Sequence, residues 1–297
     1  MFDWGFTLVL LSNGVMTGLM YSLIALGFVL VYKATDAINF AQGEFVMLAG
    51  FIIAGMLVLV GAPFLLAVVV AVLAMVAFGF GLERVVLRPL IGRPIIAVIM
   101  ATIGLATMLR GAAPFFFGAE TRAITLPISD EPIAFGAITL PPVQVVGALL
   151  SLGFLAALAW FFLRSRMGVA MRAIADNQQV ASAMGINVQR YFALAWGMGG
   201  IVSAGGGLAW GALLGVDVHL ALIGLKVFPV VILGGLDSIM GAVVGGLIVG
   251  VVENLAAGYL DPLVGGGTKD FAPYVLMIVM LMIRPDGIFG KRRIERV

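Results

Sequence analysis

Long apolar runs recur along this chain, and they constrain its fold more than any other feature of the sequence. We expect apolar spans at 6–31, 44–60, 63–83, 95–112, 140–163, 190–214, 221–235, 239–258 and 271–284. A helix needs about 20 apolar residues to cross a bilayer, and in hydrocarbon every backbone polar group must be paired within the protein. The sequence therefore predicts an all-α integral membrane protein, a polytopic bundle of about 8–9 transmembrane helices with broken or re-entrant segments.

The composition leaves room for one membrane domain only. Of the 297 residues, 62% are hydrophobic and 11% are charged, so we expect 1–297 to form a single transmembrane domain. The segment 221–235 is short for a full crossing and is predicted to be re-entrant or broken. With no cysteine and only one histidine, His219, we expect neither a metal site nor a cofactor. The net charge of +2 is too small to indicate nucleic-acid binding.

Basic residues gather in alternate linkers. Lys33 and three clusters hold 13 of the 17 Lys and Arg residues: Arg84, Arg88 and Arg93; Arg164, Arg166, Arg172 and Arg190; and Arg284, Lys291, Arg292, Arg293 and Arg296. The linker 113–139 instead carries Glu120, Asp130 and Glu131. Because cytoplasmic loops hold the excess of Lys and Arg, the N-terminus is predicted outside and the tail 285–297 inside. The first residues lack a basic stretch, so no cleaved signal peptide is expected.

A polar interruption follows the first apolar run. Within Val31 to Gly50, the residues Asn39, Gln42 and Glu44 precede renewed apolar sequence. Asn39 as N-cap, with Gln42 three residues later, resembles a capping box for a helix that starts at Phe40. Two interpretations stay open: a capped loop at the cytoplasmic surface, or a half-helix that starts inside the membrane and lines a path.

A second interruption lies in the other half of the chain, at Gly234, Gly235, Asp237 and Ser238. Asp237 or Ser238 could cap the following helix. The glycines after it, at 241, 245, 246 and 250, are typical of a helix-packing face. Paired breaks in opposite halves of a membrane protein indicate a transport path, and we expect both groups to line it.

Further ionisable residues fall in or near the apolar runs. Lys226 and Glu253 need partners or water inside a membrane, and an ion pair between neighbouring spans is as good an explanation as a role in transport. Arg110 lies near the end of its span, so we expect its side chain to reach the interface. His219 is expected to be solvated.

The longest basic linker, 164–190, reads as a helix over Met171 to Met184 that Gly185 terminates. Such a short, mildly amphipathic helix suits docking into a groove of another protein, or lying on the lipid surface. The sequence holds no GxxxxGK[ST] phosphate-binding loop, so ATP-driven transport would need a separate ATPase subunit.

Several motifs, taken in order, resemble the permeases of branched-chain amino-acid ABC importers, the LivH/LivM family. They are Asn13-Gly14, Tyr21 to Gly27, Ile38 to Glu44, Arg166-Met167-Gly168, Arg172-Ala173 with Asp176, Met184 to Asn187, Lys226, Leu233-Gly234-Gly235 with Ser238, Gly241-Ala242, Gly245-Gly246, and Arg284 to Gly290. The resemblance extends over essentially the whole chain. Gln42 and Asp237 depart from the family pattern, which usually has His and Gly there.

The resemblance implies a multi-pass permease in the cell (inner) membrane that forms half of a translocation pathway and is not itself an enzyme. Its implied partners are a paralogous LivM-type permease, two cytoplasmic ATP-binding subunits, and a periplasmic or extracellular substrate-binding protein. It also implies that the loop helix contacts an ATPase, and the residues expected there are Arg172, Ala173, Asp176, Ala181, Met184 and Gly185. Relatives that carry urea or short amides leave the solute open.

Three other functional classes of membrane protein were compared with the sequence. In an autonomous ion-coupled secondary transporter or channel for a small polar solute such as urea or an amide, Glu44, Lys226 and Glu253 would couple ions. A membrane enzyme is not indicated, because the sequence lacks a GxSxG elbow, an HExxH pair and any cysteine. A purely structural scaffold would not explain two breaks in opposite halves of the chain.

Overall fold

The computed structural model describes residues 4–90, 93–129, 131–135 and 138–290. Its longer helices are α1 (Trp4–Thr35), α3 (Phe64–Leu82), α4 (Ile95–Phe117), α5 (Pro142–Arg164), α8 (Val188–Leu214) and α10 (Ile239–Tyr259). The shorter ones are α2 (Gln42–Val58), α6 (Arg166–Asp176), α7 (Gln178–Ala183), α9 (Ile223–Gly234), α11 (Asp261–Val264) and α12 (Thr268–Ile283). The chain start, Asp130 and the basic tail 291–297, on which parts of the topology prediction depend, lie outside the described residues.

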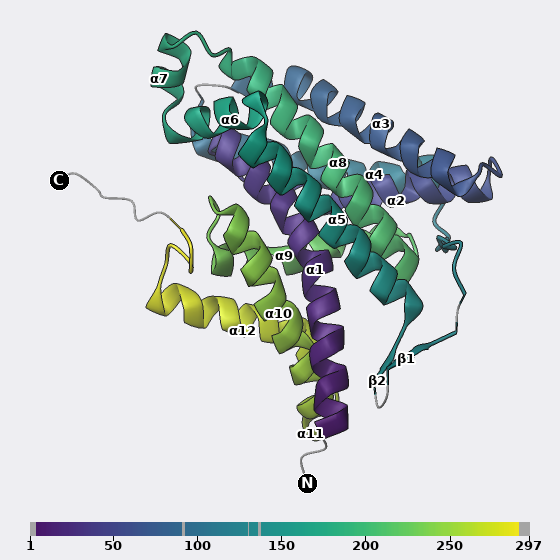
Figure 1. The fold of residues 1–297 in the computed structure, drawn as a ribbon. Coiled ribbons are helices and arrows are strands. Elements are labelled where there is room, and N and C mark those ends of the chain that lie inside the picture. Colours follow the sequence, from purple (N-terminus) through teal and green to yellow (C-terminus); the bar gives the residue numbers. More distant parts are fainter. Residues whose placement is uncertain (1–3, 91–92, 130, 136–137, 291–297) are drawn as a thin grey trace.

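Irregular elements join these helices. A π-helical turn, η1 (Glu83–Leu87), and a 3₁₀ turn, η2 (Arg88–Leu90), extend α3, and a second 3₁₀ turn, η3 (Val218–Leu222), leads into α9. Strands β1 (Ile133–Phe135) and β2 (Ile138–Leu140) form an antiparallel hairpin in which Ile133 pairs with Leu140. This hairpin lies in the linker before α5 (Figure 1).

Each apolar segment expected from the sequence coincides with a helix. Within the described residues, six helices are long and apolar enough to cross a membrane, one of them running from Phe64 through η2 to Leu90. Two apolar helical segments, Gln42–Val58 and Val218–Gly234, fall below that length. The seventh segment is therefore short, as predicted, and the total of eight or nine crossings stays a prediction.

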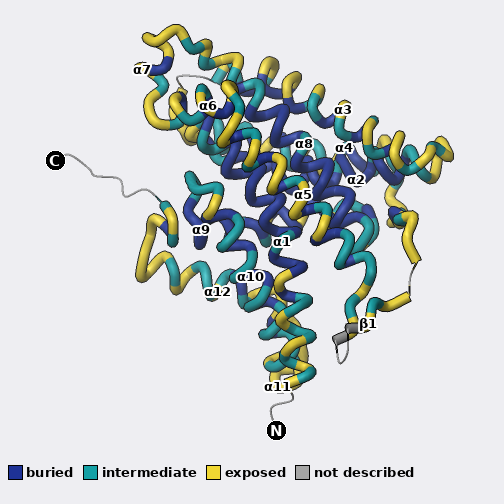
Figure 2. The backbone as a smooth tube through the Cα atoms, viewed as in Figure 1, coloured by how far each residue is buried: buried dark blue, intermediate teal, exposed yellow. Residues whose placement is uncertain are grey.

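The bundle is built around α1 and α8. In an apolar 18-residue stretch of each of these two helices, 89% is buried inside the chain. The corresponding share is 28% for the helix that includes α3 and 11% for α4. Figure 2 shows this difference as a dark centre with exposed residues along the outer helices. The start of α1 and the pair α6–α7 lie at opposite ends of the bundle (Figure 1). Because α4 is so little covered, its outer side is free to meet lipid or another protein.

Small residues bring α1 and α10 into close contact. A Cβ atom on Gly18 would lie 2.7 Å from the carbonyl oxygen of Gly246, and one on Gly250 would lie 2.4 Å from that of Gly14. No larger residue fits at these distances without moving a backbone. The prediction that the glycines after 238 form a packing face is confirmed.

Candidate functional site

The first polar interruption is buried in the protein. The exposed fractions of Asn39, Gln42 and Glu44 are 0%, 0% and 2%. The Asn39 carbonyl side-chain oxygen accepts from the Ala41 backbone N–H at 3.1 Å, and its amide nitrogen donates to Gln42 Oε1 at 3.1 Å. Gln42 Nε2 in turn donates to Ser203 Oγ of α8 at 3.0 Å. Polar side chains that would be costly in hydrocarbon are thus paired with one another.

The predicted capping box is wrong in detail. Helix α2 begins at Gln42 and not at Phe40, and its N-cap residue, Ala41, has no side-chain cap. Asn39 instead caps the turn before the helix, since its side-chain oxygen accepts from Ala41. The Gln42 side chain is unable to reach back to the backbone because it is committed to Asn39 and Ser203. Local sequence could not reveal Ser203, which lies 161 residues further along the chain.

Glu44 has a partner that the sequence reasoning missed. Arg110 Nη2 of α4 donates to Glu44 Oε1 in an ion pair, so Arg110 does not simply extend to the interface as expected. The Glu44 side chain is 2% exposed and that of Arg110 is 43% exposed. An unpaired Arg near the centre of a span costs about 2.5–3.5 kcal/mol, and burial of Glu44 likewise demands a partner. In the sequence, this pairing was indicated only by a single Arg within an apolar run.

Helix α2 starts at depth within the bundle. Thr102 Oγ1 lies 3.5 Å from the Ile38 carbonyl oxygen, and Arg110 pairs with Glu44. With a rise of 1.5 Å per residue along α4, which starts at Ile95, these two contacts lie about 10 Å and about 22 Å from its beginning. Irregular backbone at such depth occurs only where protein or a water-filled cavity surrounds it. The start of α2 is thus enclosed by protein, and its position relative to the membrane stays a prediction.

A second helix start meets the first. A Cβ atom on Gly43 would lie 2.1 Å from the Ala221 carbonyl oxygen, and one on Gly224 would lie 2.5 Å from the Gly43 Cα atom. Ala221 lies in the last turn of η3 and Gly224 is the second residue of α9, so the starts of α2 and α9 touch through glycine. From the sequence we paired the first break with the break at 234–238. In the structure, the first break instead contacts residues 221–224. In the local sequence, only Gly224 within a short apolar segment indicated this close contact.

The turn before α9 is held by the linker that precedes the hairpin. Arg122 and Val216 exchange two backbone hydrogen bonds of 3.0 and 2.8 Å. Asp217 caps η3, accepting from the His219 backbone N–H at 2.8 Å and from Thr121 Oγ1 at 3.1 Å. Burial acts to raise the pKa of Asp217, but these hydrogen bonds outweigh it and the pKa is lowered. The His219 side chain is 76% exposed, as expected for a solvated residue.

The second predicted break anchors the C-terminal segment. The backbone N–H groups of Ile288 and Phe289 donate to the carbonyl oxygens of Leu233 and Gly234 at 2.8 and 3.0 Å. These are carbonyls that the end of α9 leaves without a helical partner. Gly235 has a φ of 104°, a conformation that side-chain-bearing residues rarely adopt.

The helix after this break starts as predicted. Ser238 caps α10 by accepting from the Gly241 backbone N–H at 3.0 Å, which confirms one of the two capping residues considered. Asp237 is half-buried in the turn between α9 and α10. The close neighbours of Gly234 and Gly235 are Gly241 and the segment that ends at Gly290. This turn therefore packs the end of α9 against the start of α10 and the C-terminal segment.

Lys226 and Glu253 form the ion pair that the sequence left open. Lys226 Nζ lies 3.5 Å from Glu253 Oε1 and 2.7 Å from Asp270 Oδ1 of α12. Glu253 is fully buried, and its Oε1 also accepts from the Tyr21 hydroxyl at 3.2 Å. Its Oε2 has no hydrogen-bond partner among the described residues. The cluster ties α1, α9, α10 and α12 together, and sequence alone could not place Tyr21 or Asp270 in it.

The loop 164–190 holds two helices and not the single predicted one. The chain breaks at Asn177, which caps α7 by accepting from the Val180 backbone N–H at 3.0 Å. Gly185, with a φ of 84°, follows the end of α7 as predicted. Of the residues expected to contact an ATPase, Ala173, Asp176, Met184 and Gly185 are exposed, Arg172 is half-buried and Ala181 is buried. Most of the set is therefore accessible on one end of the bundle.

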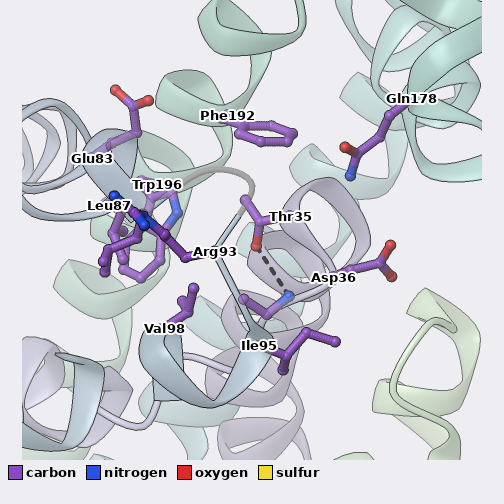
Figure 3. Close-up of a pocket in the computed structure, with 12 residues that line it drawn as sticks. Thr35, Asp36, Glu83, Leu87, Arg93, Ile95, Val98, Gln178, Phe192 and Trp196 are labelled. Carbon is purple, nitrogen blue, oxygen red and sulfur yellow. Dashed lines mark hydrogen bonds between the residues drawn. The ribbon is translucent and has the colours of Figure 1, made fainter. Parts of the chain in front are cut away.

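A cavity of about 130 Å³ lies between this loop and the first break (Figure 3). Gln178 of α7 and Ala37, two residues before Asn39, both line it. Trp196 of α8 forms another wall, and its buried Nε1 has no hydrogen-bond partner among the described residues. The cavity places α7 next to the chain segment that leads into α2.

The fold and this site define the class of the protein: a multi-pass, α-helical integral membrane protein with polar groups buried where short helices begin. Within the described residues, no group of three or more His, Cys, Asp or Glu side chains could hold a metal ion.

Comparison with known proteins gives the family. The family model described as "Branched-chain amino acid transport system / permease component" matches residues 10–283. The high-affinity branched-chain amino acid transport system permease protein LivH of Salmonella typhimurium is 33% identical over 304 residues, which cover 96% of each chain. The corresponding permease protein BraD of Pseudomonas aeruginosa is 30% identical and covers 97% of each. The chain belongs to this family of permease components.

Among solved structures, PsaBC from Streptococcus pneumoniae in complex with Fab is similar to this chain with a TM-score of 0.48 and 14% identity, covering 94% of both chains.

Proposed function

We propose that this chain is the permease subunit of an ATP-driven ABC importer for branched-chain or related hydrophobic amino acids. The observation that carries the proposal is the family match over residues 10–283, together with relatives that align over nearly their whole length and are named for this transport. The whole chain acts as a single permease domain and forms half of the translocation pathway. The other half comes from a paralogous LivM-type permease.

The remaining partners follow from what the chain lacks. Two cytoplasmic ATP-binding subunits supply ATP hydrolysis, because the sequence has no phosphate-binding loop of its own. A periplasmic or extracellular binding protein delivers the solute. The protein lies in the cell (inner) membrane with its N-terminus outside and its tail inside, as the distribution of basic residues indicates.

We assign the path to the first break. Asn39, Gln42 and Glu44 are polar, lie deep in the bundle, and stand where the starts of α2 and α9 meet. Helix starts at mid-membrane breaks present free backbone N–H groups to a solute. Gly234, Gly235, Asp237 and Ser238 contribute to the path indirectly, by fixing the end of α9 against the C-terminal segment.

We assign ATPase contact to α6 and α7. Their exposed residues, with Met184 78% exposed, offer an apolar and charged surface at one end of the bundle. The cavity behind α7 leads to Ala37 and so to the first break. A shift of α7 on ATP binding would therefore change the shape of a cavity whose wall includes Ala37, which is a short route to the break.

Purification of the tagged chain from its native membrane, followed by reconstitution, tests the proposal. We expect a second permease and two ATPase subunits to co-purify, and the assembly to accumulate radiolabelled leucine in liposomes only with ATP and the binding protein. Accumulation of urea or an amide, and not leucine, would reassign the solute. Gradient-driven uptake by this chain alone would contradict the proposal and identify an ion-coupled carrier, with Lys226 and Glu253 as the coupling residues to examine.

A further inference from the structure

The pair of Glu44 and Arg110 joins the buried start of α2 to α4, a helix on the outside of the chain. Arg110 belongs to α4, the long helix that the rest of the chain covers least: 11% of its apolar 18-residue stretch is buried. Its side chain is 43% exposed, while its partner carboxylate on Glu44 is 2% exposed. A guanidinium at this depth faces protein or water and not lipid. The open side of Arg110 is therefore expected to face water or another protein chain.

A cavity of about 260 Å³ opens beside this pair. Its charged wall is Glu44 and Arg110, and its apolar walls are the side chains of Phe40, Ile103, Ala106 and Leu225. Gly43 and Gly224 form its floor, where the starts of α2 and α9 touch. The site thus combines one negative group, one positive group and an apolar surface.

These three features correspond to the three parts of an apolar amino acid. The solute carries an ammonium and a carboxylate on the same carbon atom, and an aliphatic side chain. A guanidinium binds a carboxylate through two parallel N–H···O contacts, and a buried carboxylate binds an ammonium. The apolar walls suit the aliphatic part, because its burial removes hydrocarbon from water.

We propose that Glu44 and Arg110 contact the solute directly, opening their own ion pair to take the zwitterion between them. This inference rests on the proposed function and adds the recognising residues. Glu44 binds the ammonium group, Arg110 binds the carboxylate, and the side chain lies against Phe40 and Ile103. No charge is left unpaired before or after the exchange, which avoids the penalty of an isolated buried charge.

The exchange also explains how the solute leaves. When it departs, Glu44 and Arg110 pair again, so the protein contacts that the solute loses are replaced within the site. A pathway needs binding that is favourable enough to admit the solute and weak enough to release it. An internal ion pair that competes with the solute provides this balance.

The test uses the complete reconstituted assembly and measures leucine uptake per ATP hydrolysed. The variants are Glu44→Gln, Arg110→Gln and the double substitution Glu44→Gln/Arg110→Gln, which removes both charges without leaving either unpaired. The control is Asp261→Asn/Thr268→Val, which removes a side-chain hydrogen bond between α11 and α12 and touches neither this cavity nor the one behind α7. Thermal stability of each assembly is recorded alongside.

We expect uptake per ATP to fall about tenfold or more in the Glu44 and Arg110 variants. The control pair is expected to keep the wild-type ratio. Equal ratios in the two double variants would overturn the inference, since Glu44 and Arg110 would then be only a structural pair. Where glutamine variants fail to assemble, Glu44→Asp and Arg110→Lys shift the charges while keeping them, and unchanged uptake there would overturn it equally.

The inference and the proposed function fail in different ways. If the wild-type assembly accumulates no amino acid, the proposed function is wrong. If the wild type accumulates leucine and the double variant does so equally well, the function stands and the assignment of Glu44 and Arg110 is wrong.

Discussion

Gln42 illustrates how single polar residues are accommodated in this apolar bundle. Its amide is fully buried, accepts from Asn39 and donates to Ser203. Ser203 also donates to the Gly199 carbonyl oxygen of its own helix at 2.8 Å, so it links α8 to the start of α2. Each hydrogen bond adds little net free energy to stability, but a buried donor without an acceptor is strongly destabilising.

Substitution of Ser203 tests this connection. We expect Ser203→Ala to destabilise the detergent-solubilised protein by about 1–3 kcal/mol, because Gln42 Nε2 then lacks an acceptor. Ser151 is the matched control: it is equally buried and donates only to the Gly147 carbonyl oxygen of its own helix, at 2.8 Å. The measurement is the thermal unfolding midpoint, and equal midpoints for Ser203→Ala and Ser151→Ala would contradict the expectation.

At the scale of elements, the defining contact is between the starts of α2 and α9. Both are short, and neither reaches a full membrane crossing by length. Gly43 and Gly224 permit an approach that a methyl group would prevent. The position of each helix start, and with it the polar groups nearby, depends on this one contact.

Addition of a methyl group at Gly43 measures that contact. Gly43→Ala would place a Cβ atom 2.1 Å from the Ala221 carbonyl oxygen, so we expect destabilisation by about 1–3 kcal/mol and reduced uptake by the assembly. Gly55 lies in the same helix with nothing within 4 Å of its Cβ position. Gly55→Ala should therefore be neutral, or stabilising by up to about 1 kcal/mol. A loss of stability at Gly55 equal to that at Gly43 would refute the packing argument.

The docking of the C-terminal segment on α9 has its own test. Gly287 has a φ of 80°, and a Cβ atom there would lie 2.6 Å from the Ile232 carbonyl oxygen. Gly265 has a φ of 88° but nothing within 4 Å. Both alanine variants carry about 1–2 kcal/mol of left-handed strain. We expect Gly287→Ala to lower the melting temperature further than Gly265→Ala does, because only the former also disturbs the contact with α9.

For the whole molecule, the orientation predicted from the basic linkers can be measured directly. The chain has no cysteine, so single cysteines can be labelled without background. Glu120 and Ser182 are both exposed, one in the linker predicted outside and one in the loop predicted inside. We expect a membrane-impermeant thiol reagent to label Glu120→Cys but not Ser182→Cys in intact cells, and both after solubilisation. The reverse pattern would invert the topology.

The apolar pattern of the sequence was sufficient for the helices but not for their depth. All the expected apolar segments are helical because hydrocarbon leaves the backbone little choice. What the sequence could not provide is which polar residue meets which. Glu44 and Arg110 are 66 residues apart and Gln42 and Ser203 are 161 apart, so their pairing depends on packing between helices. The helix over Met171 to Met184 was predicted as one piece because the cap at Asn177 was not recognised.

The order in which the chain is synthesised gives these long-range pairs a consequence for assembly. Glu44 emerges 66 residues before Arg110, and Gln42 emerges 161 residues before Ser203. At about 5–20 residues per second, Glu44 waits roughly 3–13 seconds for its counterion, and Gln42 waits roughly 8–32 seconds for its acceptor. Until then, the start of α2 has no stable place in the lipid. We therefore expect this helix to be synthesised early but to take its final position only after α4 and α8 have been made.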